Sequence, residues 1–278
     1  MVSEDIYDDL PRLDFYDSAD PQRAKIYSVI TTWDRSPTLA IRRKNEEFDW
    51  SVHERMHHPK GAWTETLYIY GQALEELEGL ARSHDVYVVG LGCGYIEMLT
   101  VARWLAKYRE PEFQLRLRSF ESDPFLIEGF QSWLRGLRED ERGRFHALHE
   151  VFDSICQIIT AHFRLKPHEI RETLRAMQER GAFILENSLN REFIQHDLNP
   201  PFRANALLYD AFSSKTDPYL WEEGFLKELM SFYCEPRSLF ATYAARGVLN
   251  RALAAEKFVV KKIAGYGGKR ESTFGIRT

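Results

Sequence analysis

An apolar run that ends in a glycine-rich turn constrains the fold of this chain more than any other feature. Residues 86–89 have the length and composition of a buried strand, and Gly90-Leu91-Gly92-Cys93-Gly94 follows directly. Glycine adopts positive φ without strain and lets the backbone approach a ligand closely. In an open α/β sheet, such a strand end borders a crevice where nucleotide-like ligands bind. The turn therefore predicts an α/β protein with a ligand site at this point.

A second apolar strand is expected over residues 115–120, and it ends at Glu121. An acidic residue at the end of the second strand is placed to accept hydrogen bonds from ribose hydroxyls. The turn reads G-x-G-x-G, so it does not meet the dinucleotide pattern G-x-G-x-x-G. We therefore expect a ribose-bearing ligand, held by Gly90, Gly92, Gly94 and Glu121.

Strands and helices alternate through the rest of the chain. Further strands are expected at 182–186, 206–209, 238–243, 258–263 and 272–277, and helices at 96–108, 221–232 and 248–255. Residues 124–181 form a helical insertion, because this stretch is longer than a strand connection requires. The pattern predicts a Rossmann-like sheet of seven strands that ends in an antiparallel hairpin, within a domain over residues 83–278.

Residues 1–82 are expected to be an N-terminal extension that packs on this core. Short strands are predicted there at 38–42, 48–52 and 67–70, followed by a helix over 72–82.

Composition is that of an ordinary soluble protein, which we expect in the cytoplasm. The chain has 278 residues and three cysteines far apart in sequence. No apolar run approaches the ~20 residues that span a bilayer. The cysteines match neither a disulfide framework nor a metal site, and His53, His57 and His58 lack partners at ligand spacing, so no metal is expected.

Charge is unevenly distributed along the chain. The net charge is −5, yet residues 246–278 carry eight basic residues against two acidic ones, and Arg42-Arg43-Lys44 forms a second basic cluster. A local basic face can bind phosphates on a protein that is acidic as a whole, although charge runs are usually solvated surface. The pattern permits RNA binding without requiring it.

Several separated motifs resemble those of one known family. Residues 210–221, which read D-A-F-S-S-K-T-D-P-Y-L-W, resemble the D-[AG]-F-x-x-x-x-x-P-x-x-W signature of the bacterial MnmC tRNA wobble-uridine methyltransferases. Residues 239–247, 265–271 and 65–70 are similar to that family's L-A-T-[YF]-x-x-x-G, G-[FY]-G-x-K-R-E and E-T-x-x-V-F segments. The resemblance covers about residues 30–125 and 182–278, and it implies a class I methyltransferase sheet that binds S-adenosyl-L-methionine.

The resemblance also implies a reaction. Members of the family methylate the exocyclic amine of 5-aminomethyluridine at tRNA position 34, which gives 5-methylaminomethyluridine. The expected partner is thus the anticodon region of tRNA, with separate oxidase or aminomethyl-forming enzymes that supply the substrate. The sequence stops at Thr278, right after the expected hairpin, which indicates a stand-alone methyltransferase without an oxidase domain.

The implied site residues fall into three groups. Asp210, at the end of a strand, would accept the amine proton, and Phe212 and Tyr243 would line the base pocket. Besides the glycine turn and Glu121, the expected cofactor contacts are Glu65 and, at the end of the third strand, Glu186 or Asn187. The expected RNA contacts are Lys269 and Arg270.

Two other functions stay open at this point. One is methylation of a different amine, in a small molecule or a protein, because Ile96 and Met98 depart from the family's pattern after the glycine turn. The other is a non-catalytic RNA-binding protein that retains the fold. The acidic residues at positions 121 and 210 argue against the non-catalytic alternative, because a decayed site has no reason to keep both.

Overall fold

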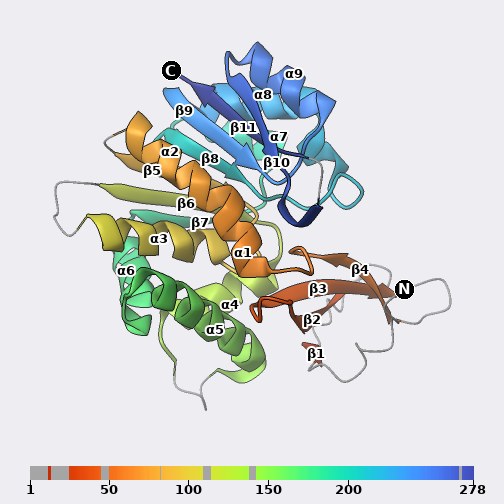
Figure 1. Cartoon of the computed structure of the whole chain (residues 1–278), viewed down its shortest axis with the longest axis vertical. Coiled ribbons are helices and arrows are strands. Elements are labelled where there is room, and N and C mark those ends of the chain that lie inside the picture. The colour runs from red at the N-terminus through yellow and green to blue at the C-terminus, as the bar shows by residue number, and fades with distance from the viewer. Residues whose placement is uncertain are drawn as a thin grey trace.

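The computed structural model describes residues 12–13, 25–44, 50–81, 83–108, 114–137, 142–268 and 271–278. A sheet of seven strands and a separate sheet of four strands organise these residues (Figure 1). The larger sheet is Rossmann-like, as the sequence predicts.

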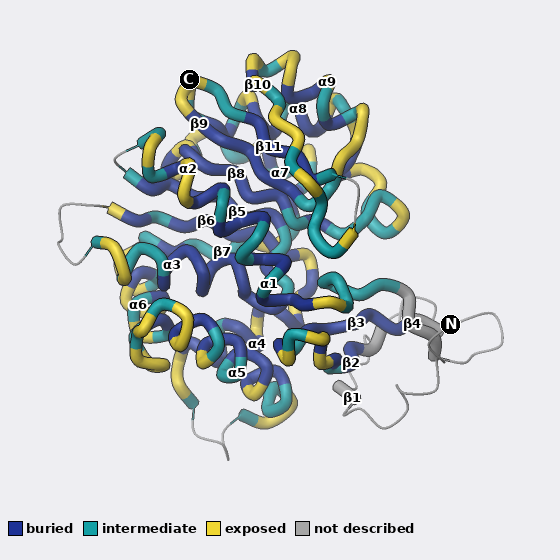
Figure 2. Tube along the Cα trace, in the orientation of Figure 1, coloured by how far each residue is buried: buried dark blue, intermediate teal, exposed yellow. Residues whose placement is uncertain are grey.

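The seven-stranded sheet has the order β10-β11-β9-β8-β5-β6-β7. Its strands are β5 (His84–Val89), β6 (Leu115–Glu121), β7 (Phe183–Asn187), β8 (Ala204–Tyr209), β9 (Cys234–Thr242), β10 (Val259–Ala264) and β11 (Glu271–Arg277). Strands β7, β6, β5, β8 and β9 are parallel, whereas β11 runs antiparallel to both β9 and β10. The predicted terminal antiparallel hairpin is confirmed. Because β5 and β8 are buried along their whole length, they read in sequence as continuous apolar runs (Figure 2).

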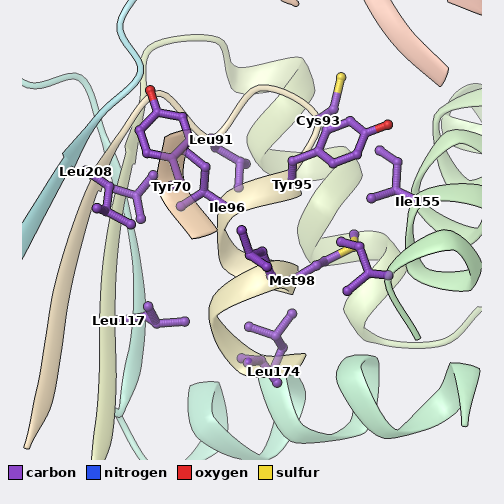
Figure 3. Close-up of a cluster of buried hydrophobic side chains, with 14 of the residues drawn as sticks. Tyr70, Leu91, Cys93, Tyr95, Ile96, Met98, Leu117, Ile155, Leu174 and Leu208 are labelled. Atoms are coloured by element: carbon purple, nitrogen blue, oxygen red, sulfur yellow. The ribbon is translucent and has the colours of Figure 1, made fainter. Parts of the chain in front are cut away.

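Each face of this sheet has its own hydrophobic core, because successive side chains of a strand point to opposite faces. Along β5, Val86 and Val88 join one core, and Tyr87 and Val89 join the other. The first core packs against α1 (Ala62–Thr66), α2 (Gln72–Leu80), α3 (Tyr95–Lys107), α4 (Pro124–Leu134), α5 (His146–Phe163) and α6 (Pro167–Glu179). Figure 3 shows Ile96 and Met98 of α3 in this core, between the sheet and the helices.

The second core packs against α7 (Arg191–His196), α8 (Glu223–Tyr233) and α9 (Gly247–Ala255). Short 3-10 turns lie between these elements, namely η4 (Gly143–Phe145), η5 (Pro218–Trp221) and η6 (Tyr266–Gly268). None of the described helices is long and apolar enough to cross a membrane.

The N-terminal residues build the smaller, antiparallel sheet, whose order is β1-β2-β3-β4. Its strands are β1 (Arg12–Leu13), β2 (Lys25–Thr31), β3 (Pro37–Lys44) and β4 (Trp50–Arg55). The predicted strand at 38–42 lies within β3, and the one at 48–52 overlaps β4. Strand β2 was not predicted. Arg42 of the predicted basic cluster is buried, so it adds no charge to the surface.

The prediction of a strand at 67–70 is wrong. These residues form a π-helical turn, η2 (Leu67–Gly71), which joins α1 to α2 without a break. Short apolar runs fit a strand and a buried helix equally well, and the surroundings decide between them. Here Ile69 and Tyr70 are buried in the first core, and helix on both sides continues through the segment.

Candidate active site

A cavity of about 290 Å³ lies at the carboxyl ends of β5, β6 and β8, near the lower end of small-molecule pocket volumes. The glycine turn after β5, the end of β6 and the segment after β8 form its base. Residues 54–59 from the end of β4, with side chains of α1 and η2, cover it from the other side. The cavity therefore occupies the position where the sequence predicts a ligand crevice.

The glycine turn is shaped by its positive φ angles and by close approach. Gly90, Gly92 and Gly94 have φ values of 96°, 51° and 72°. A Cβ on Gly90 would lie 2.6 Å from the carbonyl oxygen of Asp210, so any side chain there would push the two strand ends apart. Gly90 and Gly92 line the cavity. Gly94 instead packs against Phe130, whose ring would lie 2.6 Å from an added Cβ, so its role is to let α3 begin.

Glu121 is held in place at the edge of the cavity. Its Oε2 accepts a hydrogen bond from the Gly92 amide at 3.0 Å, and Oε1 accepts from the amides of Ser122 and Asp123 at 2.8 and 3.0 Å. Burial raises the pKa of this carboxyl, although the three amides oppose the shift. The arrangement fixes an acceptor beside the glycine turn, where a ribose of a bound ligand would lie.

Asp210 follows β8 and faces the same cavity. Its amide donates to the carbonyl oxygen of Val89 at 2.8 Å, which ties the ends of β8 and β5 together. The Tyr70 hydroxyl donates to Oδ1 at 2.7 Å. Burial, and then the charge of Asp210, raise the pKa of Tyr70 well above its usual value, so this hydroxyl keeps its proton. Asp210 is thus an oriented carboxylate that can take up a proton.

Phe212 and Tyr243 also line the cavity, as the resemblance implies. The Tyr243 hydroxyl donates to the carbonyl oxygen of Ala211 at 2.9 Å, and the Trp221 indole donates to that of Phe212 at 2.7 Å. Trp221 is itself buried in the second core. The D-A-F segment is therefore fixed by its backbone, which leaves the Phe212 ring as part of the cavity wall.

Two acidic residues from outside the sheet complete the cavity. Glu65 of α1 accepts a hydrogen bond from the His58 amide at 2.6 Å. Glu54 of β4 accepts from the Ser213 amide at 3.1 Å and from the Thr216 hydroxyl. Sequence reasoning missed Glu54, because nothing in a strand at residues 50–55 shows that it meets a loop some 160 positions later.

Glu186 and Asn187 are not among the residues that line the cavity. Glu186 pairs with Arg118 at 2.7 Å, and Arg118 also pairs with Asp197 at 2.6 Å. Asn187 is exposed at the end of β7. Lys269 and Arg270 lie outside the described residues. Of the predicted contacts, the structure thus brings together Gly90, Gly92, Glu65, Glu121, Asp210, Phe212 and Tyr243.

Histidines near the mouth have partners of other kinds. His57 Nδ1 lies 2.7 Å from the Thr38 hydroxyl, and the His58 ring makes an edge contact with Tyr266. The side chain of His53 lies outside the described residues. Among the residues whose placement is described, no group of three or more His, Cys, Asp or Glu side chains could hold a metal ion.

The cavity has an acidic and aromatic lining. Its carboxylates are Glu54, Glu65, Glu121, Asp210 and Asp217, and its basic lining residues are Arg55, His57 and His58. Phe212, Tyr219 and Tyr243 also line it. Carboxylates and ring faces both attract cations. Such a lining fits a sulfonium, and the Glu121 acceptor fits a ribose, so the residues present suit S-adenosyl-L-methionine.

Comparison with known proteins also indicates a methyltransferase that uses S-adenosyl-L-methionine. Residues 152–278 match the family described as S-adenosyl-L-methionine-dependent methyltransferase. The tRNA 5-methylaminomethyl-2-thiouridine biosynthesis bifunctional protein MnmC of Paraburkholderia xenovorans is 26% identical over 85% of this chain and 34% of its own length. The protein of the same name from Burkholderia mallei is 34% identical over 77% of this chain and 31% of its own length. The chain thus spans about a third of these relatives.

The fold has a counterpart among solved structures. MnmC2 from Aquifex aeolicus superposes with a TM-score of 0.58 at 19% identity, over 90% of this chain and 70% of that one. At this identity the likeness establishes the fold. Together with the sequence matches, it identifies the chain as similar to the MnmC methyltransferases, with S-adenosyl-L-methionine as the cofactor.

Proposed function

We propose that this MnmC-type, S-adenosyl-L-methionine-dependent methyltransferase methylates the exocyclic amine of 5-aminomethyluridine at the wobble position of tRNA, with 5-methylaminomethyluridine as the product. The observation that carries the proposal is the position of Asp210. Its carboxylate, held by Tyr70, faces the cavity directly beside the glycine turn. An amine that enters between Asp210 and the donor would lie next to a proton acceptor.

For this reaction the protein has to align the amine with the methyl donor and accept a proton. When bound, the cofactor supplies an electrophilic methyl group on a sulfonium. Gly90, Gly92 and Glu121 would hold the donor, which would give its methyl group to the amine nitrogen and keep the bonding electron pair on sulfur. The nitrogen must lose one proton, which Asp210 accepts. Alignment of two reactants by a rigid site can contribute about 7–11 kcal/mol.

Support for tRNA as the substrate comes from the relatives. The bifunctional MnmC proteins are named for the biosynthesis of 5-methylaminomethyl-2-thiouridine in tRNA. The cavity suits an aminomethyl group because a protonated amine is drawn to its five carboxylates. Phe212 and Tyr243 offer ring faces against which an extruded uracil could stack.

A transfer assay tests the proposal. Purified protein is mixed with labelled S-adenosyl-L-methionine and tRNA from cells that lack this modification, and the nucleosides are then separated. We expect label in 5-methylaminomethyluridine. Asp210→Asn keeps an acceptor for Tyr70 but removes the proton acceptor, so it should lower kcat by 10²-fold or more, a typical general-base contribution, with cofactor binding unchanged.

The same assay separates the alternatives. Label in a small amine or a protein, but none in tRNA, would overturn the wobble-uridine substrate and leave the methyltransferase intact. RNA binding without any transfer would identify a non-catalytic protein. Asp210→Asn with wild-type kcat would show that the proton leaves by another route.

A further inference from the structure

Trp33 is unusually exposed for a tryptophan. It lies in the turn between β2 and β3, and 75% of its surface is accessible to solvent. Tryptophan normally buries most of its large apolar area, and it is enriched where proteins contact other molecules. Among the residues whose burial is described, the other large apolar side chains exposed to a similar degree are Leu198 and Val259, and both are aliphatic.

The turn that carries Trp33 is held rigidly. Asp34 Oδ1 accepts hydrogen bonds from the Thr32 hydroxyl at 2.7 Å and the Ser36 amide at 3.0 Å. Its Oδ2 accepts from the amide and the hydroxyl of Thr64 at 3.0 and 2.8 Å. These bonds outweigh partial burial and hold the pKa of Asp34 below its usual value. The turn is thus fastened to α1, and the ring of Trp33 is presented on a fixed support.

This support lies beside the mouth of the cavity. The Trp33 amide donates to the carbonyl oxygen of Pro59 at 3.0 Å, and the Asp34 amide donates to that of Lys60 at 3.2 Å. Pro59 and its neighbour His58 line the cavity. Two backbone hydrogen bonds therefore connect the exposed tryptophan to the segment that forms the wall of the site.

Two basic residues belong to the same backbone region as Trp33: Arg35 lies two positions later, and the carbonyl oxygen of Lys60 accepts from the Asp34 amide. Arg35 and Lys60 are both exposed, and neither takes part in an ion pair among the described residues. Arg35 has a φ of 66°, a backbone conformation that residues other than glycine seldom adopt. Strained backbone often occurs at functional sites, so the conformation of Arg35 suggests that its charge takes part in binding. The exposed surface thus combines one aromatic ring with two cations, whereas the cavity itself is acidic.

We propose that Trp33, Arg35 and Lys60 form a docking surface for RNA, on which a base next to the modified nucleotide stacks while its phosphates meet the two cations. Aromatic rings beside basic side chains are the usual means of binding unpaired nucleotides. The surface would hold the strand while the acidic cavity admits only the aminomethyl-bearing nucleotide. This inference rests on the proposed function, because it assumes an RNA substrate.

The test uses the full chain and an RNA anticodon stem-loop that carries 5-aminomethyluridine at position 34. Trp33→Ala should weaken binding of the stem-loop by roughly tenfold, as expected for the loss of one stacked base. It should raise KM for the stem-loop with little change in kcat. Trp33→Phe, which keeps a ring, should restore most of the affinity. The double variant R35Q/K60Q should flatten the salt dependence by about 0.7 in log–log slope for each lost phosphate contact.

The control is R175Q/R180Q, which removes two exposed charges at the end of α6 and should bind RNA as the wild type does. Methylation of the free nucleoside 5-aminomethyluridine serves as the second readout, and all variants should retain it. Wild-type affinity of Trp33→Ala would overturn the docking surface while the proposed function stands. Failure of the wild-type protein to bind or methylate the stem-loop would instead refute the proposed function.

Discussion

Glu97 is a carboxyl with no access to water, three residues after the glycine turn. It is completely buried, and its Oε1 accepts a hydrogen bond from the Ser119 hydroxyl at 2.5 Å. Burial raises the pKa of Glu97 to about 8. The folded protein therefore keeps this side chain neutral at pH 7, whereas the unfolded chain ionises it near its ordinary pKa.

The pH dependence of stability follows from this difference. Below about pH 4.5 the side chain is protonated in both states and costs nothing, and as pH rises toward 8 only the folded state binds the proton, so stability falls. Glu97→Gln, which mimics the neutral acid, should remove that loss. We expect it to gain about 4 kcal/mol relative to the wild type between pH 4.5 and 8.5, at about 1.36 kcal/mol for each pKa unit between the unfolded value of 4.5 and the folded value of about 8. Urea unfolding at both pH values measures the gain, and a constant difference between the two proteins would refute it.

Residue types at strand ends could be predicted from sequence, but burial could not. Gly90 and Asp210 stand out because each follows an apolar strand. Their backbones lie close together at the carboxyl ends of the neighbouring strands β5 and β8. Glu97 reads as an ordinary acidic residue on the first turn of a helix. Only the packing of α3 against β6 encloses it.

At the scale of elements, β4 is connected to the loop after β8. Glu54 accepts hydrogen bonds from Ser213 and Thr216, so the N-terminal sheet orders the segment that begins at Asp210. Hydrogen bonds to a charged group typically contribute about 1.5–3 kcal/mol each. The loop that carries the candidate proton acceptor is thus shaped by a strand from the other sheet.

Removing this connection should loosen the loop and lower the activity. In Glu54→Ala we expect a several-fold loss of kcat/KM, together with faster amide exchange over residues 213–217, because the loop loses its acceptor. For Glu54→Gln we expect a kcat/KM between those of the wild type and Glu54→Ala, since the glutamine amide oxygen can still accept hydrogen bonds. The exposed Glu179→Ala is the matched control. Unchanged exchange in the loop would show that other contacts hold it.

The same scale explains the error at residues 67–70. Alternation of leucine, tyrosine and isoleucine fits a strand, and only the helical neighbours α1 and α2 determine that the segment is a π-helical turn. The parallel strands β5 and β8 were easier to locate, because burial along their whole length makes their apolar runs plain.

Across the whole molecule, the cavity joins parts that are distant in sequence. Its walls come from β4, from α1 and η2, and from the carboxyl ends of the large sheet. Sequence motifs indicated the contribution of the sheet, whereas the contribution of residues 54–59 depends on how the small sheet docks. A ligand in this cavity would touch both sheets at once, so its binding should stabilise the protein as a unit.

Cofactor binding should thus appear in thermal unfolding. S-adenosyl-L-methionine at 100 times its Kd should add about 2.7 kcal/mol to the free energy of unfolding and raise Tm by several degrees. Glu121→Ala should lose most of this shift, since it removes the acceptor beside Gly92. Glu172→Ala, on the exposed surface of α6, should keep it. An equal Tm shift in both variants would show that Glu121 does not contribute to cofactor binding.

The acidic lining of the cavity has a consequence for turnover. Methyl transfer converts a positively charged sulfonium into an uncharged thioether, so the spent donor loses its attraction to Glu54, Glu65 and the other carboxylates. The walls that draw the fresh donor in therefore bind the exhausted one less strongly. We expect charge to favour exchange of one for the other.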